Sequence, residues 1–159
     1  MPHLRLYVPS EWLADDFRIA TGFDATKLLD LLVQAVANLR MENPAIDARY
    51  DAAGKPIPPE IPVVNLSNLK HAIIPMESGH VGADSSSYFL HVTLAAGNDT
   101  PGRTAEVRSR AAQILGDAVD GFTAGLPGLA SVTVHVQDID RDRGYSTTAE
   151  RRKRKPGLT

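Results

Sequence analysis

The chain has 159 residues, 43% of them hydrophobic, which is the length and composition of one globular domain with a buried core. It contains no cysteine, which excludes disulfides and thiolate metal ligands, and its five histidines show neither HxxH nor HExxH spacing. We therefore expect no metal centre. Because no apolar run approaches the roughly 20 residues of a membrane span and no signal-peptide pattern opens the chain, we expect a cytoplasmic protein without a membrane segment.

The formal net charge of −2 hides an asymmetry between the two ends of the chain. Residues 141–159 contain seven Lys or Arg and two acids, a net charge of +5, so residues 1–140 carry −7. An acidic body argues against a nucleic-acid-binding domain. We expect residues 1–140 to form the domain and 141–159 to be a disordered basic tail. A tail that binds nucleic acid is the alternative, and it predicts salt-sensitive binding.

The first nine residues, MPHLRLYVP, place a proline directly behind the initiator methionine. The alternation of Leu4, Leu6 and Val8 with their neighbours predicts a strand that begins at this proline. Removal of Met1 would free the secondary amine of Pro2. Burial in an apolar pocket beside cations would lower the pKa of this amine and leave a neutral base near pH 7. The alternative is a proline that only forms a harmless terminus.

The rest of the first half predicts one long helix between irregular segments. Residues 10–23 are expected to form a turn of helix or a loop, with aromatic side chains in the core or along a pocket. Asp24 is a plausible N-cap, and apolar residues recur at helical spacing from Leu28 to Leu39, so a helix is expected to run from there to near Glu42. Five prolines make 43–62 a long loop, partly in polyproline II, and 63–77 reads as a strand.

The second half repeats this order. Residues 79–87 are turn material, and 88–97 (YFLHVTLAAG) is apolar enough for a strand buried on both faces. A short glycine loop leads to a second amphipathic helix that stops at 125–128. An alternating strand covers 129–139.

Strand, helix and strand thus occur twice, which predicts an α+β fold with a duplicated β-α-β unit. The expected sheet is mixed and four-stranded, with two helices on one face. Its other face needs a cover, and a second subunit would supply one.

A Pro2 that opens a strand, followed by this duplication, resembles the tautomerase superfamily of 4-oxalocrotonate tautomerase and macrophage migration inhibitory factor. The run 88–139, with its HVTL strand and its glycine loop ending in Arg103, is similar to 5-carboxymethyl-2-hydroxymuconate Δ-isomerase. The resemblance implies a homotrimer whose sheets form an inner barrel, with active sites near the subunit boundaries. It does not cover the proline-rich loop or the basic tail.

The resemblance also implies the chemistry, which needs no cofactor. Pro2 would be the general acid/base that moves a proton between the enol and keto forms of an unsaturated 2-hydroxy or 2-oxo acid, as in the degradation of aromatic compounds. Arg103 and Lys70 would bind substrate carboxylates, and Tyr88, with Trp12, would wall the pocket. Lys70 stands where the family has an arginine, so it keeps the charge but loses the bidentate fork.

His71 and His91 are expected to be packed, hydrogen-bonded histidines. Two other functions stay open at this stage. One is a proline-dependent hydratase, dehalogenase or decarboxylase of 3-carbon acids. The other is a noncatalytic trimeric binding protein of the same fold.

Overall fold

The computed structural model describes residues 2–43, 46–57, 59–77, 79–82, 84–97 and 103–139. Met1, the glycine loop at 98–102 and the predicted tail at 141–159 lie outside the described residues. Among the described helices, none is long and apolar enough to cross a membrane.

Four strands form the body of a mixed sheet in the order β6 (Lys70–Met76), β1 (His3–Pro9), β8 (Asp84–Gly97) and β9 (Leu129–Ile139). A short fifth strand, β7 (His80–Val81), pairs with the start of β8. β6 is parallel to β1 and β9 is parallel to β8, whereas the central pair β1 and β8 is antiparallel. This arrangement confirms the predicted duplication, because each half contributes one parallel pair joined by a helix.

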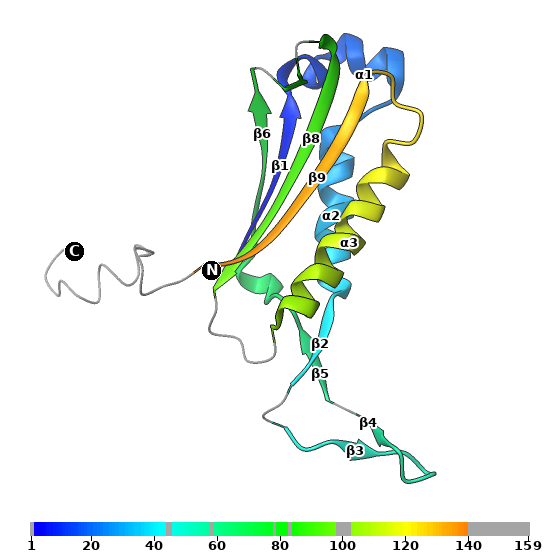
Figure 1. Ribbon diagram of the computed structural model, residues 1–159, viewed down its shortest axis with the longest axis vertical. Coiled ribbons are helices and arrows are strands. Elements are labelled where there is room, and N and C mark those ends of the chain that lie inside the picture. The colour runs from blue at the N-terminus through cyan, green and yellow to red at the C-terminus, as the bar shows by residue number, and fades with distance from the viewer. Residues whose placement is uncertain are drawn as a thin grey trace, which may run out of the picture.

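Two long helices, α2 (Ala25–Asn38) and α3 (Ala105–Phe122), cover one face of the sheet (Figure 1). The Asp24 carboxylate accepts hydrogen bonds from the Thr26 and Lys27 N–H groups at 3.0 and 3.2 Å, which confirms the predicted N-cap. A third helix, α1 (Asp15–Thr21), and the 3-10 helix η1 (Ser10–Leu13) lie at one end of the sheet (Figure 1).

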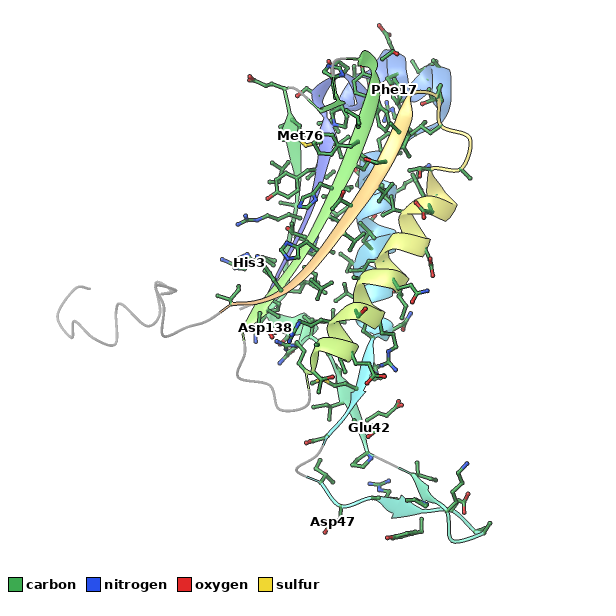
Figure 2. All side chains as sticks on the ribbon, in the orientation of Figure 1. His3, Phe17, Glu42, Asp47, Met76 and Asp138 are labelled. Carbon is green, nitrogen blue, oxygen red and sulfur yellow. The ribbon has the colours of Figure 1, made fainter. Side chains whose placement is uncertain are left out.

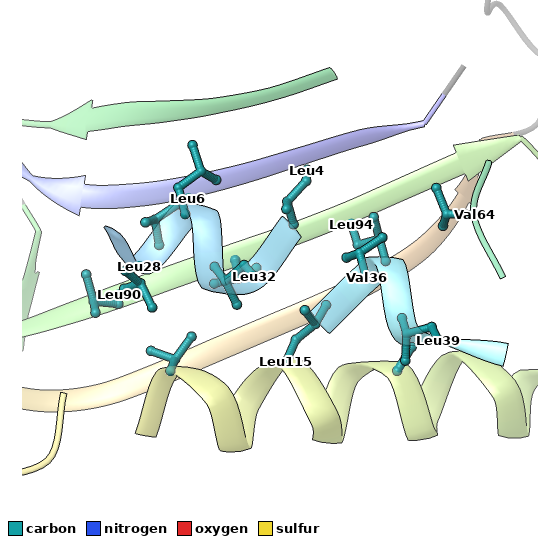
Figure 3. Packing of buried hydrophobic residues seen from close by; sticks show 14 of the residues in the cluster. Leu4, Leu6, Leu28, Leu32, Val36, Leu39, Val64, Leu90, Leu94 and Leu115 are labelled. Atoms are coloured by element: carbon teal, nitrogen blue, oxygen red, sulfur yellow. The ribbon is translucent and has the colours of Figure 1, made fainter. Parts of the chain in front are cut away.

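The core lies between the sheet and the two long helices. Alternate residues of β1 and β8 point toward the helices and are fully or almost fully buried, as the period of two requires. Figure 3 shows side chains from both layers in this cluster: Leu4, Leu6, Leu28, Leu32, Val36, Leu90, Leu94 and Leu115. The packed layer fixes the height and direction of β1, and therefore the place where this strand begins.

None of the described helices lies over the opposite face of the sheet (Figure 1). The prediction that residues 88–97 would be buried on both faces is wrong within one chain, because His91 and Thr93 on this face stay partly exposed. Thr133 and His135 on β9 are exposed beside them. This face therefore carries polar side chains on both of these strands.

Two segments differ from the sequence prediction. Residues 40–62 contain two short ladders where the sequence predicted the end of the helix, up to residue 42, and an unpaired loop over 43–62. Together the ladders form an arm that projects from one end of the sheet (Figure 1). The paired strands are β2 (Arg40–Glu42) with β5 (Glu60–Pro62), and β3 (Arg49–Tyr50) with β4 (Pro56–Ile57). Proline is compatible with these positions because each ladder has only two strands, both of them edges.

The strand predicted over 63–77 begins at Lys70 in the structure. Val63 and Val64 are buried without belonging to a strand, and the 3-10 helix η2 (Leu66–Asn68) follows them. Asn65 caps η2 by accepting a hydrogen bond from the Ser67 N–H at 3.1 Å. This local bond gives the backbone an alternative to the sheet ladder.

Candidate functional site

Pro2 is buried at one end of the sheet, directly before β1. Its carbonyl accepts a hydrogen bond from the Lys70 N–H at 3.1 Å, which ties it to the first residue of β6. His3 pairs with Ala95 of β8, so the next residue back, Pro2, lies opposite Ala96. Both neighbouring strands therefore fix the position of Pro2.

Three charged side chains meet at this end of the sheet. The Asp138 carboxylate, near the end of β9, is 3.3 Å from Nη1 of Arg103 through Oδ1 and 2.6 Å from Nη1 of Arg108 through Oδ2. Arg103 also donates from Nη2 to the Val63 carbonyl at 2.9 Å, and Arg108 donates to the Arg103 carbonyl at 3.1 Å. We call Arg103, Arg108 and Asp138 the ion cluster. Figure 2 shows Asp138 at the same end of the sheet as His3.

A groove of about 590 Å³ opens beside the ion cluster. The groove is lined by the end of α2, by β2 and β5, and by η2 with the two residues before it. The lining residues are Ala37, Arg40, Ile61, Pro62, Val64, Asn65, Leu66 and Ser67. The exposed Arg40 donates from Nη1 to the Ala37 and Leu39 carbonyls at 2.7 and 3.1 Å. Residues 63–70 connect the groove to the ion cluster and to Pro2. The Val63 carbonyl accepts a hydrogen bond from Arg103, and the Lys70 N–H donates one to the Pro2 carbonyl.

The outer face of the sheet is also cationic near Pro2. Lys70 is exposed and pairs in register with His3. Burial lowers the pKa of His3 below its ordinary value of 6.5, and the nearby charges of Arg5 and Lys70 lower it further. Pro2 therefore lies at the end of the sheet that has the ion cluster on its helix side and two cations, Arg5 and Lys70, on its outer side.

Of the four residues predicted for the site, Lys70 lies next to Pro2, through the bond from its N–H to the Pro2 carbonyl, and Arg103 lies in the ion cluster at the same end of the sheet. The Arg103 side chain is only 6% exposed, and its guanidinium binds the Asp138 carboxylate and the Val63 carbonyl. It therefore links β9 to the segment before η2 and is almost fully buried. Lys70 is the more accessible of the two predicted cations.

Tyr88 does not approach Pro2 within one chain. It lies toward the opposite end of β8, where its ring is 4.6 Å from that of His80 and 5.4 Å from that of Trp12. Trp12 is 2% exposed and belongs to the hydrophobic core. The prediction that these two aromatic residues wall the Pro2 site is corrected for the single subunit, because antiparallel pairing places the start of β8 beside the end of β1.

The two histidines expected to pack behave differently. The His91 ring is 5.3 Å from the ring of Tyr7, and burial, with a smaller effect of His135, lowers the pKa of His91 below 6.5. His71 is exposed, contrary to expectation. Within the described ranges no group of three or more His, Cys, Asp or Glu is placed to hold a metal ion.

Sequence reasoning missed Asp138, Arg108 and Arg40. A signal for Asp138 was present, because it continues the inward alternation of β9 with an acid where the preceding inward positions are valines. A buried-face acid at a strand end predicts a cationic partner. Arg40 gave no comparable signal, since its role depends on the groove.

No family model and no curated protein matches this sequence. Solved structures do match. A 5-carboxymethyl-2-hydroxymuconate delta-isomerase is 15% identical with a TM-score of 0.57, over 100% of this chain and 96% of that chain. A 5-carboxymethyl-2-hydroxymuconate isomerase from Deinococcus radiodurans R1 is 17% identical with a TM-score of 0.57, over 98% and 96%.

A fused 4-OT protein, described as a symmetric trimer, is 15% identical with a TM-score of 0.50 over 92% of both chains. These identities establish the likeness of the fold. With the duplicated β-α-β unit, the mixed sheet and the two helices on one face, they show that this chain has the fold of the tautomerase superfamily.

Proposed function

We propose that this protein is a cofactor-independent tautomerase that uses the amine of Pro2 as a general acid/base. The observation that carries the proposal is the position of Pro2. In a chain with the tautomerase fold, this residue is buried between β6 and β8, and the N–H of a cationic residue, Lys70, binds its carbonyl. The proposal includes the removal of Met1, because the Pro2 nitrogen is basic only as a free secondary amine.

The surroundings of Pro2 favour its neutral amine. Burial disfavours the ammonium form, and so do nearby positive charges from Lys70 and from an ion cluster of two arginines and one acid. A neutral amine can take a proton from an enol or a carbon acid and return it to another carbon of the same molecule. General acid–base catalysis of this kind contributes about 100- to 10,000-fold to a rate.

The proposed substrate is an unsaturated 2-hydroxy or 2-oxo carboxylic acid. Its intermediate is a dienolate, whose developing negative charge is stabilised by cations fixed in advance. We assign the carboxylate to Lys70, which is exposed and adjacent to Pro2, since Asp138 engages the Arg103 guanidinium and the Ala37 and Leu39 carbonyls engage that of Arg40. Arg103 then acts by holding the wall of the groove through the Val63 carbonyl.

We further propose a homotrimer. The sheet face without helices, which carries His91, Thr93 and Thr133, would meet the same face of two other subunits. The symmetric trimer with the same fold supports this assembly. An assembly of this kind would bring residues of a neighbouring subunit to the Pro2 end of the sheet, which could then include its Tyr88.

The test begins with the intact mass of the purified protein, which is expected to lack Met1. Conversion of 2-hydroxymuconate or phenylenolpyruvate to the ketone is then compared for the wild type and Pro2→Ala. We expect kcat/KM to fall by roughly 100-fold or more in Pro2→Ala. Pro9→Ala is the matched control, because Pro9 is buried at the other end of the same strand.

Pro9→Ala should keep the pH profile of the wild type even if it lowers the melting temperature. A mass that retains Met1, or full activity in Pro2→Ala, would contradict the proposed mechanism.

A further inference from the structure

The ion cluster is organised by its acid. Each oxygen of the Asp138 carboxylate takes a different arginine, at 3.3 Å for Arg103 and 2.6 Å for Arg108. Arg108 lies in the first turn of α3 and Arg103 just before its N-cap, Thr104, whereas Asp138 belongs to β9, so the carboxylate joins two layers of the fold. Since the side chains are 6%, 31% and 26% exposed for Arg103, Arg108 and Asp138, water screens the group only in part.

The register places this cluster in the same row of the sheet as Pro2. Asp138 pairs with Ala96 in β8, and Pro2 lies opposite Ala96 from the other side. The three positions share the helix face, because Leu4, Leu94 and Val136 form the next inward row. Two strand spacings separate the backbones of Pro2 and Asp138 by about 10 Å.

The residue between them does not shield the two groups. Ala96 is 5% exposed and carries only a methyl group. Counted over the described residues, the two guanidinium groups and one carboxylate of the ion cluster carry a net charge of one unit, which acts on Pro2 through a partly buried region. At about 10 Å in such surroundings one unit charge changes the pKa of an amine by roughly half a unit to one unit.

We propose that Asp138 is a positioning residue that holds Arg103 and Arg108 in place and limits the positive charge at Pro2 to one unit. This inference rests on the proposed function, since it concerns the same amine. Asp138 does not contact the substrate in this scheme. Its effect is to set the pH range in which Pro2 is a neutral base, because it offsets one of two arginines that would otherwise both oppose the ammonium form.

Other charged or titratable groups lie near the Pro2 end. They are His3 and Arg5 on β1, Lys70 and His71 on β6, and Arg40 at the start of β2. None of them changes in the variants below, so their effects cancel when variants are compared with the wild type.

The test measures the pH dependence of kcat/KM and, without substrate, an NMR titration of the Pro2 amine labelled with nitrogen-15. Asp138→Asn raises the cluster charge to two units, so both the acidic limb of the profile and the amine titration should move down by roughly half a pH unit to one unit. Arg108→Gln lowers the cluster charge to zero, so both should move up by a similar amount. The double variant should return close to the wild type.

Asp120→Asn is the control. It removes an exposed acid farther along α3, on the same helix as Arg108, and should shift neither measurement. A purely structural role of Asp138 would reduce stability in both cluster variants without shifting them in opposite directions. Shifts of the same sign, or none, would overturn the inference.

The two readouts separate this inference from the proposed function. The wild type could lack tautomerase activity while the pKa of the Pro2 amine still shifts in opposite directions in Asp138→Asn and Arg108→Gln. That result would contradict the proposed enzymatic function and support the electrostatic role of Asp138. Activity that depends on Pro2, with an amine that does not respond to either variant, would do the reverse. A retained Met1 would overturn both.

Discussion

Asp138 continues an alternation whose earlier members, Val132, Val134 and Val136, all face the helices. The alternation alone would have placed this acid on the inner face of the last strand, where partial burial favours a cationic partner, but the sequence analysis did not use this signal. The identity of the partners could not be predicted. Arg103 and Arg108 lie 35 and 30 residues away in the chain, and only the packing of α3 on β9 brings them near.

A similar limit applies to Arg103 itself. The resemblance to known isomerases predicted a substrate-binding arginine, whereas the structure bonds its guanidinium to Asp138 and to the Val63 carbonyl. Val63 was expected inside a strand, where its carbonyl would belong to a ladder. Because Val63 lies outside the strand, its carbonyl has no ladder partner among the described strands and can accept the hydrogen bond from Arg103. A strand prediction that includes Val63 does not anticipate this bond.

The two histidines with lowered pKa values predict how stability depends on pH. His3 and His91 bind protons less readily in the folded chain than at their ordinary pKa of 6.5. The unfolded chain therefore takes up more protons as the pH falls through 6.5, and the folded state loses stability below that value. Chemical denaturation at pH 7.5 and 5.5 should show this loss, and His91→Gln should reduce it.

Thr133→Val is the matched control for this experiment. Thr133 pairs with His91 in the sheet, and its replacement by valine leaves every titratable group in place. The variant should therefore keep the pH dependence of the wild type. A His91→Gln protein with undiminished pH dependence would show that burial of this ring does not contribute.

At the scale of secondary structure, the elements with a strong period were predicted well. Asp24 marked the start of α2, and the alternation over 129–139 gave β9 with its observed bounds. The arm was not predicted, since its paired strands have two or three residues and no period to detect. Such short ladders form because the fold brings two separate segments of the chain side by side, and the local sequence of each segment carries little sign of the pairing.

The cap of α2 makes a prediction at this scale. Asp24→Ala removes the acceptor for two backbone N–H groups, so the free energy of unfolding should fall by about 1 kcal/mol. Asp24→Asn keeps an oxygen in the same position and should retain most of this stability. Urea denaturation of both variants measures the difference.

Asp30→Ala is the control for the cap. It removes the same charge from an exposed position within α2, where the backbone N–H groups have helical partners. If Asp30→Ala destabilised the protein as much as Asp24→Ala, the effect would be a general one of charge and not one of capping.

The molecule as a whole has one covered and one uncovered sheet face, and this leads to a prediction about assembly. If the uncovered face joins three subunits, a charge at its centre would be buried without a partner at considerable cost. Thr93 points outward from the central strand β8 and pairs in register with Arg5 of β1, so a lysine at this position would face a like charge. Thr93→Lys should therefore convert a trimer into smaller species in native mass spectrometry.

Gln113→Lys is the matched control, because it places the same side chain on the exposed side of α3. It should leave the assembly unchanged. A wild type that is monomeric at micromolar concentration, or a Thr93→Lys protein that stays trimeric, would contradict the proposed use of this face.

The duplicated architecture also bears on how the chain could be divided. Each half builds its own parallel pair and its own helix, and the halves meet along the β1–β8 ladder and where α2 packs on α3. A break between Met76 and Gly79 would interrupt no helix and no strand. Two separately produced fragments, each with one β-α-β unit, should then associate into the native sheet. The amine of Pro2 would be carried by the first fragment, and the ion cluster by the second.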